Sequence, residues 1–200
     1  MRALFLNCTL KRSPEPSNTE RLARVVAEAL EGEGVDVSMI RVVDHDVHPG
    51  VTSDEGAGDA WPAIREQILA AEILVLATPT WLGQPSSVAK RVLERMDAML
   101  SETGDDGAPV AYNRVAGFVV TGNEDGAHHV IAELAQGAID IGFTVPGQAW
   151  TYWNMGPGPG PSYEDTDHGH EWSRTTGETA ARNLHAAAKA LAASPIPAPS

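Results

Sequence analysis

The sequence has 200 residues, of which 42% are apolar and 20% are charged, so one domain can bury a sizeable core and wholesale disorder is excluded. Fourteen basic side chains against 27 acidic ones give a formal net charge of −13, which argues against nucleic acid or an anionic membrane as a partner. An anionic ligand would therefore need local basic groups or aligned backbone N–H donors.

Neither targeting nor disulfide signals are present in the sequence. No window of about 18 consecutive apolar residues occurs, and the apolar run at the start is too short for a signal peptide. The single cysteine, Cys8, excludes an internal disulfide and a CxxC framework, and it is expected to be a small buried side chain. We therefore expect a cytoplasmic protein that has no membrane partner.

Apolar runs and apolar residues at helical spacing alternate along the chain. In chain order the patterns predict a strand at 3–8, a helix at 17–32, a strand at 35–43, an acidic loop without a core of its own at 44–60, a helix at 61–71, a strand at 72–77, a helix at 86–100, a strand at 114–121, a helix at 128–141, a strand at 142–152, an irregular segment at 156–161 and a helix at 171–193. Residues 1–193 are interpreted as a single domain with an aromatic and Gly/Pro-rich extension at 150–171, and 194–200 as a frayed tail.

This alternation predicts an α/β fold. Near-continuous apolar strands separated by amphipathic helices indicate a five-stranded parallel sheet covered on both faces, a three-layer doubly wound domain. Ligands of such domains bind beyond the carboxyl ends of the strands. Functional residues are therefore expected after Cys8, Ala77 and Thr121.

The loop after the first strand, residues 9–19, carries four hydroxyl side chains and the adjacent cations Lys11 and Arg12. A phosphate there would meet free backbone N–H groups, the positive end of a helix dipole and O–H donors. The loop has no glycine, so the GxGxxG and P-loop motifs are absent. Ser17 can also be a helix N-cap with Glu20 completing a capping box, which is compatible with phosphate binding.

Two further loops contain groups suited to a ligand. Residues 78–87 are stiffened by two prolines, and Trp81 there can cover the face of a flat heterocycle or pack as core. Residues 121–129 contain Gly122 and Gly126, which allow close backbone approach. All three loops are expected at the same edge of the sheet.

Together, the sequences Ser17-Asn18-Thr19, Pro79-Thr80-Trp81-Leu82-Gly83-Gln84 and Thr121-Gly122-Asn123 resemble the flavodoxin-like NAD(P)H-dependent FMN reductase and NAD(P)H:quinone oxidoreductase family over roughly residues 1–150. The resemblance implies the flavodoxin-like strand order 2-1-3-4-5. It implies that the FMN phosphate is held by Thr9, Lys11, Arg12, Ser13, Ser17, Asn18 and Thr19. It places Pro79, Thr80, Trp81, Leu82, Gly83 and Gln84 along the isoalloxazine ring, and Thr121, Gly122, Asn123, Glu124, Asp125 and Gly126 on its far side.

The function implied is that of an FMN-dependent oxidoreductase that transfers a hydride from NADH or NADPH through the flavin to a quinone, a flavin or another small acceptor. The cofactor carries the chemistry, so no catalytic side chain is assigned. A flavodoxin-type electron carrier and a cofactor-less binding module are the alternatives. A homo-oligomer, either a dimer or a tetramer, is expected.

Two polar clusters are not assigned to a metal. One contains Asp44, His45, Asp46 and His48, and the other contains Asp167, His168, His170 and Glu171. Neither has HExxH spacing or a Cys/His framework. The segment Trp150-Thr151-Tyr152-Trp153-Asn154-Met155, followed by GPGPGP, leaves three interpretations open. Its aromatic side chains can roof the flavin, contact a second subunit, or cover the C-terminal helix.

Overall fold

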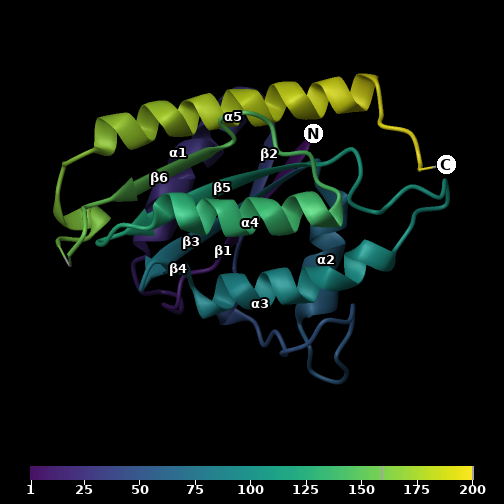
Figure 1. Ribbon diagram of the computed structural model, residues 1–200, viewed down its shortest axis with the longest axis horizontal. Helices are drawn as coiled ribbons and strands as arrows, with labels where there is room; N and C mark the ends of the chain where they lie inside the picture. The colour runs from purple at the N-terminus through teal and green to yellow at the C-terminus, as the bar shows by residue number, and fades with distance from the viewer. Residues whose placement is uncertain (159, 200) are drawn as a thin grey trace.

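The computed structural model describes residues 1–158 and 160–199, which form one sheet between two layers of helices (Figure 1). The strands are β1 (Arg2–Asn7), β2 (Asp36–Arg41), β3 (Ile73–Trp81), β4 (Gln84–Pro85), β5 (Val115–Gly122) and β6 (Trp150–Asn154). The helices are α1 (Asn18–Gly32), α2 (Trp61–Ala70), α3 (Ser87–Met96), α4 (Ala127–Ile141) and α5 (His170–Ala193), with 3₁₀ turns at Val42–Asp44, Asp97–Ser101 and Tyr163–Asp165.

The strand order β2-β1-β3-β5-β6 confirms the predicted order 2-1-3-4-5, because β5 and β6 are the fourth and fifth of the strands predicted from the sequence. Every neighbouring pair along this path is parallel. A sixth, two-residue strand, β4, was not predicted and pairs antiparallel with the end of β3.

Successive side chains of the buried strands point to opposite faces of the sheet and pack into two separate hydrophobic cores. Phe5 and Val75 face α1 and α5, whereas Leu4 and Leu76 face α2, α3 and α4. All four side chains are at most 1% exposed, and burying each contributes about 1.5–3 kcal/mol. The period of two along each strand therefore supports both helical layers at once.

β3 is longer than predicted, because Thr78–Trp81 continue the strand that the sequence pattern ends at Ala77. Strand β1 pairs with β3 only as far as Asn7 opposite Ala77, while β5 stays paired up to Thr121 opposite Pro79. At Thr78 and Pro79, β3 therefore has only β5 as a neighbouring strand, and a proline that lacks an N–H donor is tolerated on the open side. The expected loop at 78–87 is thus largely a strand followed by a hairpin.

Two other predicted elements end differently. The strand expected at 142–152 begins only at Trp150 and runs to Asn154, as β6. Thr144 forms an isolated bridge with Val115, because Pro146 and the positive φ of 53° at Gln148 interrupt the extended chain between Thr144 and Trp150. The helix expected at 86–100 ends as α3 at Met96 and continues as a 3₁₀ turn.

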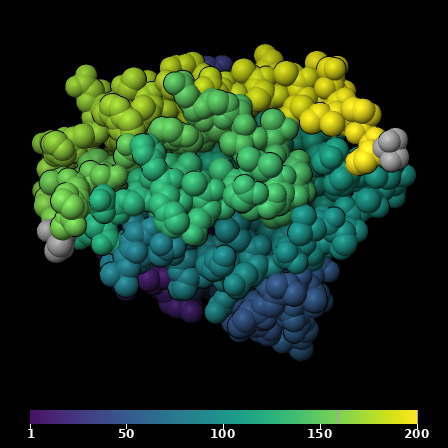
Figure 2. All heavy atoms as spheres, in the orientation of Figure 1, coloured from purple at the N-terminus to yellow at the C-terminus, as the bar shows by residue number. Residues whose placement is uncertain are grey.

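The acidic loop 44–60 packs onto the core under α2, α3 and α4 and forms no separate cluster among the described residues, in agreement with the prediction. Its Val47 is buried, and its Asp59 carboxylate accepts a hydrogen bond of 2.7 Å from the guanidinium of Arg95, both side chains being fully buried. Trp61 lies under the same guanidinium at 5.8 Å. The loop projects below α2 and α3 and forms the blue lobe of Figure 2, anchored by this pair.

Asp59→Ala is expected to lower the free energy of unfolding by about 3–5 kcal/mol, because Arg95 would stay buried without its partner. Urea denaturation measures the loss. Asp140→Ala, which removes an exposed carboxylate bonded to Gln136, is the control and should change stability by less than about 0.5 kcal/mol.

The same ion pair predicts a pH dependence. Burial raises the pKa of Asp59, but backbone hydrogen bonds to its carboxylate and the charge of Arg95 outweigh burial and lower the pKa to about 2. The unfolded value is about 3.9, so the stabilisation is complete above that pH and is lost as the pH falls towards 2. The stability difference between wild type and Asp59→Ala should shrink over this interval, and a constant difference would contradict the assignment.

Candidate functional site

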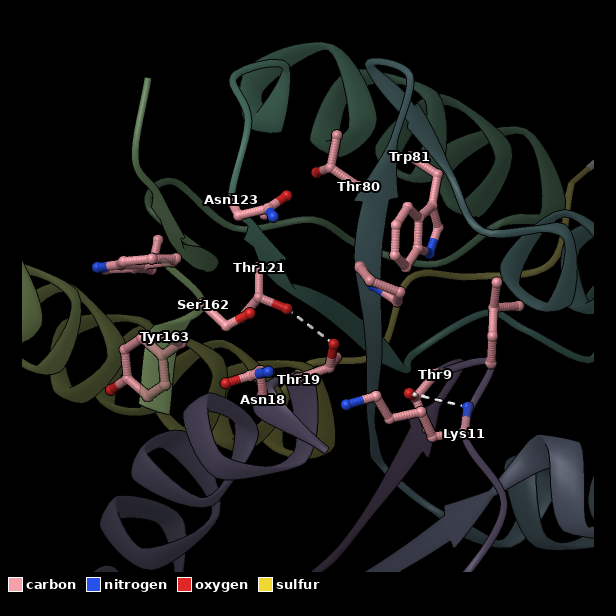
Figure 3. A pocket seen from close by; sticks show the side chains of 14 residues that line it. Thr9, Lys11, Asn18, Thr19, Thr80, Trp81, Thr121, Asn123, Ser162 and Tyr163 are labelled. Carbon is pink, nitrogen blue, oxygen red and sulfur yellow. Dashed lines mark hydrogen bonds between the residues drawn. The ribbon is translucent and has the colours of Figure 1, made fainter. Parts of the chain in front are cut away.

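A pocket opens at the carboxyl edge of β1, β3, β5 and β6, where the topology predicts a ligand site (Figure 3). It is open to solvent. The residues around it are Thr9, Leu10, Lys11, Asn18, Thr19, Pro79, Thr80, Trp81, Thr121, Gly122, Asn123, Trp153, Ser162 and Tyr163.

One end of the pocket lies between the end of β1 and the start of α1. The Thr9 hydroxyl accepts a hydrogen bond of 3.3 Å from the backbone N–H of Lys11, and the Lys11 side chain extends across the pocket towards Thr19 (Figure 3). Ser17 caps α1 by accepting from the N–H of Glu20. The N–H groups of Asn18 and Thr19 have no intrahelical partner, so this end presents backbone donors and one cation.

The predicted capping box is only half formed. Instead of bonding back to Ser17, the Glu20 carboxylate accepts from the Arg41 guanidinium at 2.6 Å and from the Asn7 amide at 3.3 Å. Arg41 also donates to the carbonyl of Glu15 at 2.7 Å. This guanidinium at the end of β2 therefore fixes the loop that precedes α1.

The other end of the pocket lies where β3 and β5 end side by side. The Thr80 side chain is 2% exposed, and its hydroxyl has no hydrogen-bond partner among the described residues. A Cβ on Gly122 would lie 3.0 Å from the Thr80 Cβ, so only glycine allows this approach. On the pocket floor the hydroxyls of Thr19 and Thr121 are 2.8 Å apart, and one of the two keeps a hydrogen free to donate.

A hairpin at the mouth of the pocket exposes Trp81, whose side chain is 53% exposed and is therefore not core. Leu82 and Gly83 turn the chain with φ of 51° and 71°, the signs of a type I′ turn. A Cβ on Gly126 would lie 2.9 Å from the Cα of Gly83, which shows that the loop after β5 packs tightly against the hairpin.

Several residues named from the family resemblance lie outside the pocket lining, and their roles stay predictions. These are Arg12, Ser13, Ser17, Leu82, Gly83, Gln84, Glu124, Asp125 and Gly126. Ser13 is engaged elsewhere, because its hydroxyl donates to Asp44 at 2.6 Å, and this bond together with that of the Ser13 N–H lowers the pKa of Asp44.

Four lining residues were not predicted individually: Leu10, Trp153, Ser162 and Tyr163. Trp153 lies 5.5 Å from Tyr163 in an edge-to-face arrangement, and its indole donates to the carbonyl of His168. The sequence did contain a signal for Trp153. Successive side chains of a strand point to opposite faces of the sheet, so Trp153 is expected on the face opposite to Trp150 and Tyr152. Trp150 and Tyr152 face the other side and cluster with His128.

The segment that carries Ser162 and Tyr163 is tied to both walls of the pocket. The backbone carbonyl of Asn123 accepts a hydrogen bond of 3.1 Å from the N–H of Gly160, and the side-chain amide of Asn123 donates to the carbonyl of Gly160. The side chain of Asn18 accepts from the N–H of Glu164 at 2.8 Å. Two asparagines at the pocket thus hold a stretch of chain about 40 to 140 residues away in sequence.

The described residues were also searched for a metal site, a reactive cysteine and a membrane-spanning helix. No three His, Cys, Asp or Glu side chains there gather as a metal site. Burial raises the pKa of the Cys8 thiol to about 12, so the thiol stays neutral and is no nucleophile. No described helix has the length and apolarity to cross a membrane.

Comparison with known proteins identifies the family. The model of the family described as NADPH-dependent FMN reductase matches residues 1–157. The chain belongs to this family. Membership supports FMN and NAD(P)H as the cofactors and confirms the resemblance drawn from the three loops.

Two curated relatives match over 173 residues. The chain is 40% identical to the 8-demethyl-8-aminoriboflavin-5′-phosphate synthase of Streptomyces davaonensis, with 82% of this chain and 67% of that protein covered. It is 44% identical to a protein of Mycobacterium bovis named divalent metal cation transporter MntH, with 84% of this chain but only 25% of that protein covered. The chain thus spans only a quarter of the length of the Mycobacterium bovis protein.

Solved structures agree with the family assignment. The structure of RosB with the bound intermediate 8-demethyl-8-formylriboflavin-5′-phosphate superposes with a TM-score of 0.89 at 34% identity, covering 98% of this chain and 82% of that chain. An NAD(P)H:quinone oxidoreductase from Methanothermobacter marburgensis gives 0.60 at 14% identity, covering 92% and 98%, and an archaeal flavodoxin gives 0.57 at 14%, covering 92% and 99%. These last two show the flavodoxin-like fold alone.

The donor set of the pocket fits FMN. The unpartnered Thr80 hydroxyl is a buried polar atom that a ligand can satisfy. Lys11 and the free N–H groups at the start of α1 match a phosphate, as expected at a helix N-terminus.

Lys11→Ala is expected to raise the dissociation constant for FMN about tenfold, because a hydrogen bond to a charged group contributes about 1.5 kcal/mol or more. Lys90→Ala is the matched control, since Lys90 is an exposed lysine of α3 outside the pocket lining, and it should change the constant less than about twofold. Titration of flavin fluorescence measures both, and riboflavin, which lacks the phosphate, should not distinguish the variants. An equal loss for both variants would contradict the placement of Lys11 at the phosphate.

Proposed function

We propose that this protein is an FMN-dependent oxidoreductase that takes a hydride from NAD(P)H and passes electrons to a quinone, a free flavin or another small acceptor. The observation that carries the proposal is the pocket, in which Lys11 and the start of α1 at one end occur together with Pro79 and Trp81 at the other, at the carboxyl edge of the sheet. The family assignment supports the flavin part of the proposal.

In this proposal the two ends of the pocket have separate roles. Thr9, Lys11 and the first turn of α1 hold the phosphate, with Arg41 as a positioning residue that fixes the loop. Pro79, Thr80 and Trp81 on one side and Gly122 and Asn123 on the other border the isoalloxazine ring.

The chemistry that bound FMN supplies is acceptance of a hydride from the reduced nicotinamide. The residues of this chain bind, orient and exclude water. The lining contains no Asp, Glu, His or Cys, and its titratable side chains are Lys11 and Tyr163. No acid or base is therefore assigned, and the hydroxyl of Thr80 orients the ligand by donating a hydrogen bond.

A second candidate is chemistry on the flavin itself. It is favoured by the 40% identity to a relative named as a synthase of an aminoriboflavin phosphate and by the TM-score of 0.89 with a structure that holds a formylriboflavin phosphate. In that case the pocket would hold FMN as a substrate, bound through the same phosphate and ring contacts.

Turnover and flavin analysis together distinguish these functions. FMN-loaded protein should consume NADPH or NADH in proportion to added quinone, while mass spectrometry of the extracted flavin shows unchanged FMN. Recovery of an 8-formyl or 8-amino flavin would favour the second candidate. FMN binding without any NAD(P)H turnover would favour the flavodoxin-type carrier, and failure to bind FMN would leave only a binding module.

We also propose a cytoplasmic homo-oligomer. Trp172, which is 47% exposed, lies 4.8 Å from Tyr152 on the edge strand β6, and with Trp150 and His128 it forms an aromatic surface of the kind that subunits bury. Light scattering of the purified protein should give twice or four times the mass of the chain, and Trp172→Ser should shift this towards the monomer. A wild-type monomer would exclude the assembly.

A further inference from the structure

One wall of the pocket comes from the short 3₁₀ turn Tyr163–Asp165, which we name the Tyr163 turn. Tyr163 and the N-cap of the turn, Ser162, line the pocket, and Tyr163 is only 5% exposed. Within the turn, the Asp165 carboxylate accepts from the N–H of Ser162 at 3.2 Å, and the N–H of Asp165 donates to the Ser162 carbonyl at 2.9 Å. These local bonds make the turn a small unit that can move only as a whole.

Aromatic contacts join the Tyr163 turn to β6 and α5. The imidazole of His170 stacks on the Tyr163 ring with the centroids 3.9 Å apart, and its Nε2 donates to the Tyr163 carbonyl at 2.8 Å. Trp153 meets the same ring edge to face at 5.5 Å. The attachment of the turn to α1, on the opposite side, depends on other groups.

Side chains of α1 hold the Tyr163 turn through Glu164. The side-chain oxygen of Asn18 accepts from the N–H of Glu164 at 2.8 Å, and the Arg21 guanidinium pairs with the Glu164 carboxylate at 3.2 Å. The Arg21 side chain is 62% exposed, and exposed ion pairs contribute little to stability. The bond to Asn18 is therefore the more specific of these two contacts.

The same asparagine presents donors to the phosphate end of the pocket. Because the N–H of Glu164 is a donor, the amide oxygen of Asn18 must face it, and the amide nitrogen must face the other way. In Figure 3 the oxygen lies on the side of Tyr163 and the nitrogen on the side of Lys11. Asn18 thus stands between the Tyr163 turn and the place where a phosphate would meet Lys11.

We propose that Asn18 is a positioning residue that couples a bound phosphate to the Tyr163 turn. A phosphate held by Lys11 and the start of α1 accepts a hydrogen bond from the Asn18 nitrogen, while the Asn18 oxygen keeps the turn against the pocket. The inference rests on the proposed function, because it takes the phosphate of FMN as the ligand. It goes beyond that function by making one wall of the pocket respond to the ligand.

The coupling follows from the use of one side chain for two bonds. Both bonds need the same rotamer of Asn18, so a ligand that makes the first bond has already met the entropy cost of holding the side chain for the second. A bound phosphate therefore stabilises the closed position of the turn, and by reciprocity the closed turn strengthens phosphate binding. A flavin without a phosphate lacks this effect, so the Tyr163 turn contributes to the choice of FMN over riboflavin.

Hydrogen–deuterium exchange of the peptide that contains Glu164, followed by mass spectrometry, tests the coupling. With each flavin at saturation, FMN should slow exchange about fivefold or more relative to the free protein, and riboflavin less than about twofold.

Asn18→Asp separates the two bonds of this side chain. Its carboxylate can still accept from the N–H of Glu164, but it offers no donor and repels a phosphate. A negative charge is favourable in the first turn of a helix, so the variant should fold. The free variant should exchange as the wild type does, and protection by FMN should fall to the level given by riboflavin.

Arg21→Gln is the matched control, because it removes the other contact between α1 and Glu164 and lies outside the pocket lining. It should leave the difference between FMN and riboflavin unchanged. Equal protection by the two flavins, or full protection by FMN in Asn18→Asp, would overturn the coupling while FMN binding and turnover stand. Phosphate-dependent protection in a protein that oxidises no NAD(P)H would sustain the coupling and overturn the proposed function.

Discussion

The unequal lengths of two neighbouring strands determine where this protein can bind a ligand. β1 ends at Asn7, whereas β3 continues from Ala77 to Trp81, beside β5 as far as Pro79 and paired with the short strand β4 at Thr80 and Trp81. The space left beside β3 is walled by the chain that leaves β1 and by the first turn of α1. A proline can occupy the unpaired stretch of β3 because no strand there needs its missing N–H. The pocket is thus a direct consequence of strand register.

A network of polar side chains then gives this space its shape. Arg41 joins the end of β2 to Glu20 and to the loop before α1, and Asn18 and Asn123 tie down the distant segment that carries Tyr163. These bonds connect parts of the chain that are far apart in sequence, so the walls of the pocket become rigid only when the whole fold has formed. Preorganised walls of this kind lower the entropy cost of holding a flat ligand.

The strong negative charge of the chain makes local arrangement decisive for anionic ligands. Lys11 with the start of α1 forms a local positive region on an acidic protein. A phosphate held there, as in the proposed function, would be recognised by charge as well as by hydrogen bonds, which makes its binding sensitive to salt.

The sequence by itself determined the α/β class, the strand order and the three loops at one edge, because these depend on local periodicity and on the general geometry of parallel sheets. It also located the N-cap Ser17 and the lining residues Lys11, Thr80 and Asn123. Only the tertiary structure decided that β3 extends beyond the end of β1 and that Asp59 of the acidic loop pairs with Arg95 of α3. It also decided that Trp153 and Tyr163 complete the pocket. Those features depend on contacts between distant segments, whose register and packing no local pattern encodes.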